Sequence, residues 1–238
     1  MYVNRLFAAA ALFVLGCAIA SAASIGQMDT FTTGTQNWVA PDPDNPNPPT
    51  TALGGPGGAL DQYLKLVANG GDFAPETAGS RMTVLNGAQW AGNYVAAGIG
   101  GIALDVNNLG PDPLYLRLLF ESFPGIPGST PPSALAFSTN AIFVPVRSGW
   151  MHIVFPIAPG NLMAPIPGTT AAQALADVDV LRIFNNPNPA FGGPQNGPPM
   201  VHATLGVDNI TAVPEPGSAA LIGIGLFLVL RSRKTRQS

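Results

Sequence analysis

The chain has 238 residues, of which only 10% are charged, and it contains 28 glycines and 25 prolines. Its net charge of −3 argues against nucleic-acid binding, which normally requires a basic surface. One cysteine excludes an intramolecular disulfide framework and a cysteine zinc cluster, and two histidines cannot form a three-histidine metal site.

The N-terminus has the pattern of a secretory signal peptide. The positive charge of Arg5 precedes an apolar run over residues 6–20, and the small residues Ala20-Ser21-Ala22 follow. We therefore predict that residues 1–22 form a signal peptide, that cleavage follows Ala22, and that the protein is exported.

Cys17 leaves a second type of export signal open. The stretch Val14-Leu15-Gly16-Cys17 resembles a lipoprotein signal, in which the cysteine is acylated. Such signals prefer a small residue where Leu15 stands, and a conventional exit site follows five residues later. The conventional signal is therefore favoured, and it removes the only cysteine from the mature chain.

Residues 23–212 contain nine segments with the polar–apolar alternation and the Gly, Pro, Asn and Asp boundaries of β-strands. The predicted strands are 25–31, 62–67, 80–85, 101–106, 113–120, 141–146, 149–155, 178–184 and 203–210. The segments 141–146 and 149–155 flank a predicted turn at Arg147-Ser148. A single helix is predicted over 170–176, with Thr169 or Thr170 as its cap. We predict an all-β fold, a two-sheet antiparallel sandwich of the jelly-roll type with one short helix.

This domain resembles galactose-binding-like and carbohydrate-binding-module jelly rolls. The resemblance rests on Asp29-Thr-Phe31, Asp61-Gln-Tyr63, Gln89-Trp90-Ala-Gly-Asn93-Tyr94, Leu104-Asp105 and Leu205-Gly-Val-Asp208-Asn209-Ile210. It implies a calcium ion between the first and last strands, with Asp29 and Asp208 as ligands and residues 59–61 as a third source. The usual first ligand follows the aromatic residue, where this chain has Thr32, and an ordinary strand-end role for Asp208 is the alternative.

A glycan site needs aromatic faces for stacking and planar polar groups for hydroxyls. The densest such cluster is Gln89, Trp90, Asn93 and Tyr94, and Arg117 is a further candidate on a strand face. The alternative is that Trp90, like Trp38 and Trp150, belongs to the core. The domain has five basic and twelve acidic residues, a net charge of −7, so an anionic polymer is a poor electrostatic partner.

No catalytic pattern was found in this domain. The nucleophile elbow, the H-E-x-x-H motif, the phosphate loop and the dinucleotide fingerprint are all missing from the sequence. Glu76 and Glu121, the only glutamates of the domain, lie on separate segments. The Glu-x-Asp-x-x-Glu spacing of jelly-roll β-glucanases does not occur. We expect a strand-face position for His152 and no enzymatic activity.

The C-terminal 26 residues combine three parts in a fixed order. Val213, Pro214, Glu215 and Pro216 open a rigid motif over 213–218, in which the prolines favour an extended chain. An apolar helix is predicted over 219–230. A basic tail, 231–238, carries Arg231, Arg233, Lys234 and Arg236 and would stay in the cytoplasm. The apolar part is short for a bilayer, so we expect a transient inner-membrane anchor.

This arrangement resembles the PEP-CTERM sorting signal of exopolysaccharide-producing Gram-negative bacteria. This type of C-terminus is also known as an ice-binding-protein C-terminus, a name that implies nothing about the domain before it. The resemblance implies recognition by an exosortase-type membrane protease and cleavage near the motif. We expect an exported protein that passes through the inner membrane to the cell surface or matrix and binds glycan or exopolysaccharide there. A structural or adhesion protein without a small ligand is the alternative, ahead of a diverged glycan hydrolase.

Overall fold

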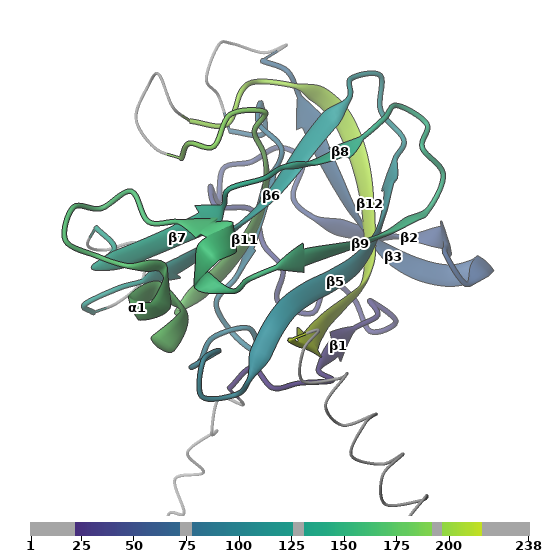
Figure 1. Ribbon diagram of the computed structural model, residues 1–238. Coiled ribbons are helices and arrows are strands. Elements are labelled where there is room, and N and C mark those ends of the chain that lie inside the picture. The colour runs from purple at the N-terminus through teal and green to yellow at the C-terminus, as the bar shows by residue number, and fades with distance from the viewer. Residues whose placement is uncertain (1–21, 72–77, 126–130, 192–196, 216–238) are drawn as a thin grey trace, which may run out of the picture.

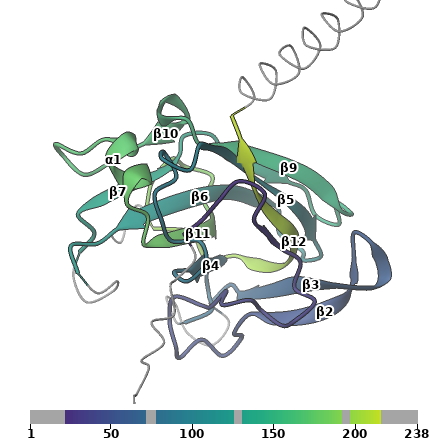
Figure 2. The same cartoon turned by 90° about the horizontal axis from the view of Figure 1, so that it is seen from below.

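The computed structural model describes residues 22–71, 78–125, 131–191 and 197–215. They form a two-sheet antiparallel β-sandwich with one short α-helix, as predicted (Figures 1 and 2). Residues 1–21 of the predicted signal peptide, together with the predicted apolar helix and basic tail, lie outside this range. Among the described residues, none of the helical segments has the length and hydropathy to cross a membrane.

Sheet A has the strand order β2-β3-β12-β5-β9, and β1 pairs with β12 beside this path. Its strands are β1 (Met28–Asp29), β2 (Thr50–Gly55), β3 (Gly58–Asn69), β5 (Ile99–Asn108), β9 (Met151–Pro156) and β12 (His202–Pro214). The central strand β12 therefore has hydrogen-bonded neighbours on both sides, β3 and β1 on one side and β5 on the other.

Sheet B has the strand order β10-β7-β6-β11-β4, and β8 pairs with β6. Its strands are β4 (Thr83–Asn86), β6 (Leu114–Ser122), β7 (Ala134–Ser138), β8 (Ile142–Val144), β10 (Leu162–Met163) and β11 (Val180–Asn185). A 3₁₀ turn, Pro159–Asn161, precedes β10. The helix α1 (Ala171–Ala176) packs its buried residues into the main core near β6 and β7.

The main core lies between the two sheets, because alternate residues of each strand point inward. Leu64, Leu104 and Leu205 from sheet A are fully buried with Leu116 and Leu118 from sheet B. Burial of apolar area at about 25 cal/mol per Å² makes this layer the main source of stability.

The two outer faces differ in how they are covered. A second apolar cluster on sheet B contains Leu119, Phe137 and Phe184, and Ile166 and Phe191 pack over it from loops. The outer face of sheet A instead presents polar side chains, among them Lys65 on β3, Asp105 on β5 and His152 on β9. A ligand that binds to a sheet surface can therefore reach sheet A more readily than sheet B.

Helix α1 begins where the sequence predicts. Thr170 is the N-cap, and its hydroxyl accepts a hydrogen bond from the backbone N–H of Gln173. The side chain of Gln173 accepts the N–H of Thr170 in return, which completes a capping box.

Several strand predictions need correction. The strands β2, β7 and the short β10 were not predicted, and the strand expected over 25–31 is reduced to β1. The strands flanking Arg147-Ser148 do not pair, because β8 joins β6 in sheet B and β9 joins β5 in sheet A. Finally, β12 ends at Pro214, two residues beyond the predicted domain boundary at 212.

A buried carboxylate ties the first strand to two distant tryptophans. Oδ2 of Asp29 accepts hydrogen bonds from Nε1 of Trp38 and Nε1 of Trp90, both at 2.7 Å, and from Nε2 of Gln89 at 3.0 Å. Asp29 is 3% exposed, and both indole rings are buried. One carboxylate oxygen therefore accepts from three N–H donors, two of which are buried indole groups.

We expect Asp29→Ala to lower the free energy of unfolding by about 3 kcal/mol or more, because it leaves two indole N–H groups buried without an acceptor. Asp29→Asn should have a smaller effect in the same direction, since its amide oxygen still accepts. Urea unfolding followed by tryptophan fluorescence measures both. Asp44→Ala, at an exposed loop position, serves as the control. Equal stability of Asp29→Ala and the control would contradict this role for Asp29.

Candidate functional site

The predicted aromatic cluster is part of the core. Trp90 and Tyr94 are both 0% exposed. The Trp90 indole donates to Asp29, and the Tyr94 hydroxyl donates to the Trp90 carbonyl at 2.8 Å. Burial raises the pKa of Tyr94 well above its ordinary value. Neither ring offers a face to a sugar, so the core alternative describes both residues.

The polar members of that cluster have structural partners. Gln89 donates to Asp29 and to the carbonyl of Gln36, and its Oε1 accepts from Asn37 at 3.1 Å. Asn93 is exposed, but its Oδ1 accepts the backbone N–H of Ala96 at 2.8 Å. Gln89 and Asn93 therefore shape the loop around Trp90.

Arg117 lies on β6 in sheet B, away from this cluster, and it is buried. Its guanidinium donates to the carbonyl oxygens of Ser138, Thr139, Asn186 and Pro187 at 2.6–3.0 Å. Burial lowers the pKa of Arg117. Through these four hydrogen bonds, Arg117 fixes the loops that cover the outer face of sheet B. The burial of Arg117 does not agree with the prediction that it contacts a ligand.

The predicted calcium ligands do not fit a shared ion. Oδ2 of Asp29 is occupied by three N–H donors, which a cation would have to displace. The carboxyl of Asp208 faces Asn209, Asp61 and Asp105 instead. Within residues 22–71, 78–125, 131–191 and 197–215, no group of three or more His, Cys, Asp or Glu residues is placed to hold a metal. Asp61, the third predicted source, does lie beside Asp208.

Asp208 and Asp61 form a carboxyl pair beneath the turn that joins β2 and β3. Asp208 is 1% exposed, and it forms a side-chain hydrogen bond with Asp61. Oδ2 of Asp61 also accepts the backbone N–H of Gly57 at 2.7 Å. A Cβ atom at Gly55 would lie 2.5 Å from Oδ2 of Asp61, so glycine is required there for the turn to approach the pair.

The pKa of Asp208 is raised to about 7, first by burial and then by the charges of Asp61 and Asp105 and by the hydrogen bond with Asp61. The backbone N–H of Asn209 acts in the opposite direction. Asn209 has φ of 50°, at an irregularity of the β12–β5 register between Asp208 and Thr211. This irregularity interrupts the regular alternation of β12 directly after Asp208.

Asp105 connects the carboxyl pair to an exposed histidine. Its Oδ1 lies 2.8 Å from Nδ1 of His152, and its Oδ2 accepts from Nδ2 of Asn209 at 2.8 Å. The side chain of His152 is 66% exposed on the neighbouring strand β9, as the strand-face prediction required. Asp105 and His152 therefore place hydrogen-bonding groups on the solvent side of sheet A.

An aromatic pair lies next to these groups. The rings of Tyr63 on β3 and Trp150 are 5.2 Å apart and nearly perpendicular. Both approach Gly206 of β12, where a Cβ atom would lie 2.9 Å from Trp150 and 3.1 Å from Tyr63. Nε1 of Trp150 donates to the carbonyl of Gly54 at 3.0 Å. Gly206 therefore lets two rings from distant segments meet above the central strand.

We call the outer side of sheet A, which carries Asp61, Tyr63, Lys65, Asp105, Trp150, His152 and Asp208, the polar face. Tyr63 and Asp208 are its buried members. The sequence interpretation assigned Trp150 to the core alternative and did not select Tyr63. The alternation in 62–67 was the available signal, because it places Tyr63 and Lys65 opposite the inward Leu64 and Leu66. The meeting of Tyr63 with Trp150 could not be inferred, because 87 positions separate them.

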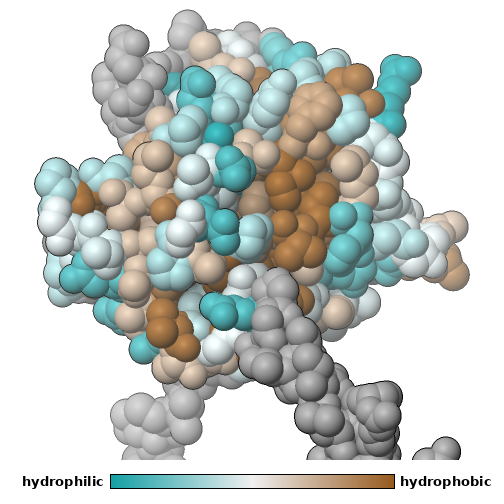
Figure 3. Space-filling model, in the orientation of Figure 1, coloured by the Kyte–Doolittle hydropathy of each residue, from teal (hydrophilic) through white to brown (hydrophobic). Residues whose placement is uncertain are grey.

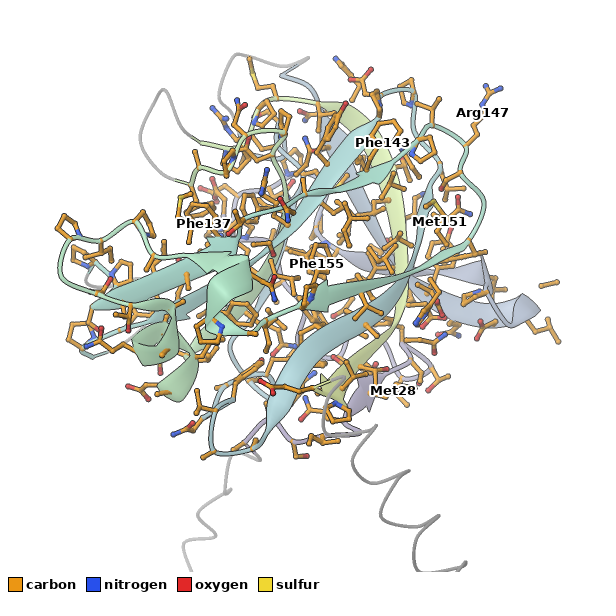
Figure 4. The ribbon with its side chains drawn as sticks, viewed as in Figure 1. Met28, Phe137, Phe143, Arg147, Met151 and Phe155 are labelled. Atoms are coloured by element: carbon orange, nitrogen blue, oxygen red, sulfur yellow. The ribbon has the colours of Figure 1, made fainter. Side chains whose placement is uncertain are left out.

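A second surface feature is an apolar groove between the sheets. Ile142, Val154 and Phe155 line a cavity of about 180 Å³, with Ser138, Asn140 and Asn161 among its polar lining residues. Figure 3 shows apolar side chains gathered at this place, and Figure 4 shows Phe155 on β9 with Phe143 on β8 above it. The groove contains no titratable side chain among its lining residues.

The C-terminal residues match a known family model over 212–234, described as the PEP-CTERM protein-sorting motif. The chain carries a PEP-CTERM sorting motif. Of its predicted residues, Val213, Pro214 and Glu215 are described in the structure, whereas Pro216 and the basic cluster Arg231, Arg233, Lys234 and Arg236 are not. PEP-CTERM proteins are exported and sorted to the cell surface, and the motif implies processing by an exosortase.

The domain that precedes the PEP-CTERM motif is similar in fold to solved structures. One is an exo-β-agarase, with a TM-score of 0.52 and 13% identity over 81% of this chain and 25% of the agarase chain. Another is a family 11 carbohydrate-binding module from Clostridium thermocellum in complex with a β-1,3-1,4-mixed-linked tetrasaccharide. Its TM-score is 0.48, with 12% identity over 81% of this chain and 98% of that chain. No curated protein matches the sequence. At these identities the likeness concerns the fold alone.

We expect Asp208→Asn to change how stability depends on pH. An unfolded aspartate loses its proton near pH 4, whereas folded Asp208 keeps it to about pH 7. The folded state then binds the extra proton, so this group makes stability fall as pH rises from about 4 to about 7. Asparagine mimics the protonated carboxyl and should be more stable than the wild type at pH 8, by about 2 to 4 kcal/mol.

Chemical denaturation of both proteins at intervals from pH 4 to pH 8 measures this effect. The difference between their free energies of unfolding should grow toward pH 7 and then remain constant. A difference that does not change with pH would contradict the raised pKa of Asp208.

Proposed function

We propose that this protein is exported, processed by an exosortase at the inner membrane, and held at the cell surface or in the exopolysaccharide matrix, where its jelly-roll domain binds glycan without enzymatic activity. The match of residues 212–234 to the PEP-CTERM motif carries the sorting part of the proposal. Processing would break one peptide bond near the motif and pass the acyl group to water or to an acceptor amine. The sequence pattern of residues 1–22 supports export.

The polar face supports glycan binding. Sugars bind to proteins through aromatic faces and planar hydrogen-bonding groups. The polar face places the partly exposed ring of Trp150, which packs on the buried ring of Tyr63, beside Asp105 and His152. The similarity of this sandwich to part of an exo-β-agarase chain supports the fold on which such a face is built. Polysaccharide as the ligand class is our proposal.

The burial of Asp208 supports a role without catalysis. Glycoside hydrolysis uses two carboxyl groups that both reach the substrate. Here the carboxyl with the raised pKa is 1% exposed and hydrogen-bonded to Asp61. A sugar on the polar face could contact Asp105 and His152, but the carboxyl of Asp208 lies beneath the β2–β3 turn.

We expect Trp150→Ala to weaken polysaccharide binding by about tenfold or more, because a buried aromatic contact commonly contributes more than 1 kcal/mol. Affinity electrophoresis against agarose, mixed-linkage β-glucan and the exopolysaccharide of the host measures this. Phe143→Ala is the matched control, since Phe143 is an exposed aromatic residue on sheet B. An absence of binding by the wild type to every polysaccharide would favour a structural or adhesion role.

Intact mass of the protein recovered from its host tests sorting. We expect mature protein to lack residues 1–22 and the tail 231–238, because the signal peptide and the sorting signal are both processed. Retention of the tail in mature protein would contradict processing by an exosortase. Glu215→Ala within the motif should increase the fraction that retains the tail.

A further inference from the structure

The sorting motif begins inside the folded domain. Strand β12 continues to Pro214, and within it Val213 is the register partner of Gly101, and Pro214 that of Ile99, on β5. Figure 1 shows the end of β12 lying between β1 and β5. No linker therefore separates the sandwich from the first two residues of the motif.

The residue before the motif is held from both sides. On the β1 side, Gly26 donates its N–H to the carbonyl of Ala212 at 2.9 Å, and Ala212 donates to the carbonyl of Gln27 at 3.0 Å. On the other side Ala212 is the register partner of Ile102. Ala212 is 1% exposed. The residue directly before the motif is therefore buried and paired with a neighbouring segment on each side.

Two glycines on β5 make room for the motif. A Cβ atom at Gly100 would lie 2.3 Å from Cα of Glu215 and 2.4 Å from its backbone nitrogen. At Gly101 it would lie 3.0 Å from Cγ2 of Val213. Neither glycine is among those with positive φ, so backbone conformation does not require them. Their missing side chains instead allow residues 213–215 to lie directly on β5.

We infer that this docking holds the motif back from the membrane protease, and that processing requires residues 213–215 to detach from β5. The inference rests on the proposed function. A protease that binds its substrate as an extended strand uses backbone groups of the kind that β5 already engages. The folded domain and the protease therefore compete for one segment. Loss of a single ladder hydrogen bond shifts such an opening equilibrium by about tenfold.

Gly100→Ala tests the inference without changing any residue of the motif. Its methyl group collides with the backbone of Glu215 and should release the end of β12. We expect the full chain, expressed with the exosortase of its host, to lose its C-terminal tail about tenfold faster than the wild type in a pulse-chase experiment. Hydrogen exchange of the uncleaved protein over residues 211–215 should be faster as well.

Gly125→Ala is the matched control, because Gly125 has open space around it and no positive φ. It should be processed at the wild-type rate. A second variant inserts Gly-Ser-Gly-Ser between Ala212 and Val213, which frees the motif while β12 stays paired through Ala212. If Gly100→Ala does not fold, processing of this insertion variant at the wild-type rate still overturns the inference.

The outcomes separate the two proposals. Faster processing of both variants supports the inference. Wild-type rates in a folded Gly100→Ala protein with a released strand end, or in the insertion variant, overturn the inference and leave the proposed function intact. Faster processing of the insertion variant alone, with Gly100→Ala folded and its strand end released, also overturns it, because distance from the membrane then sets the rate. A wild-type chain that keeps its tail in the presence of exosortase overturns both.

Discussion

The antiparallel ladder of β12 with β3 and β5 is the interaction on which the other features of this molecule depend. Inward residues of the strand, such as Leu205, belong to the main core. On the opposite side, Gly206 leaves room for the aromatic pair, and Asp208 lies in the carboxyl pair. The same ladder ends in the sorting motif at Pro214. Core, polar face and processing signal therefore share one strand, and a change in its pairing affects all three.

Two buried aspartates show how the same side chain can have opposite effects on stability. Asp29 accepts hydrogen bonds from Trp38, Trp90 and Gln89, so its carboxylate supplies the acceptor that these N–H donors need inside the fold. Asp208 is surrounded by other carboxyls, which favour its protonated form. The groups around a buried carboxyl therefore decide whether its burial stabilises or destabilises the fold.

Local pattern predicted the sandwich class, most strands and the helix capped by Thr170, because alternation and capping are properties of neighbouring residues. It missed β7, which is buried on both faces and therefore does not alternate. Pattern also could not decide which face of a strand the loops would cover. It favoured Trp90, whose polar neighbours bind Asp29, over Trp150, which meets Tyr63 across the sheet. Those choices depend on contacts between distant segments, which one sequence does not display.

The pairing of β1 with the end of β12 has a consequence for the order of events during export. Met28 and Thr211 are register partners, although nearly the whole domain separates them in sequence. Ala23 is fixed at the same time by its N–H, which donates to the carbonyl of Ala91 at 2.8 Å. Sheet A can therefore close only after the last strand, β12, has joined the rest of the domain. A chain that ends before His202 lacks both the strand that joins β3 to β5 and the sorting motif. A chain that carries the sorting motif therefore also carries β12, the strand that completes sheet A.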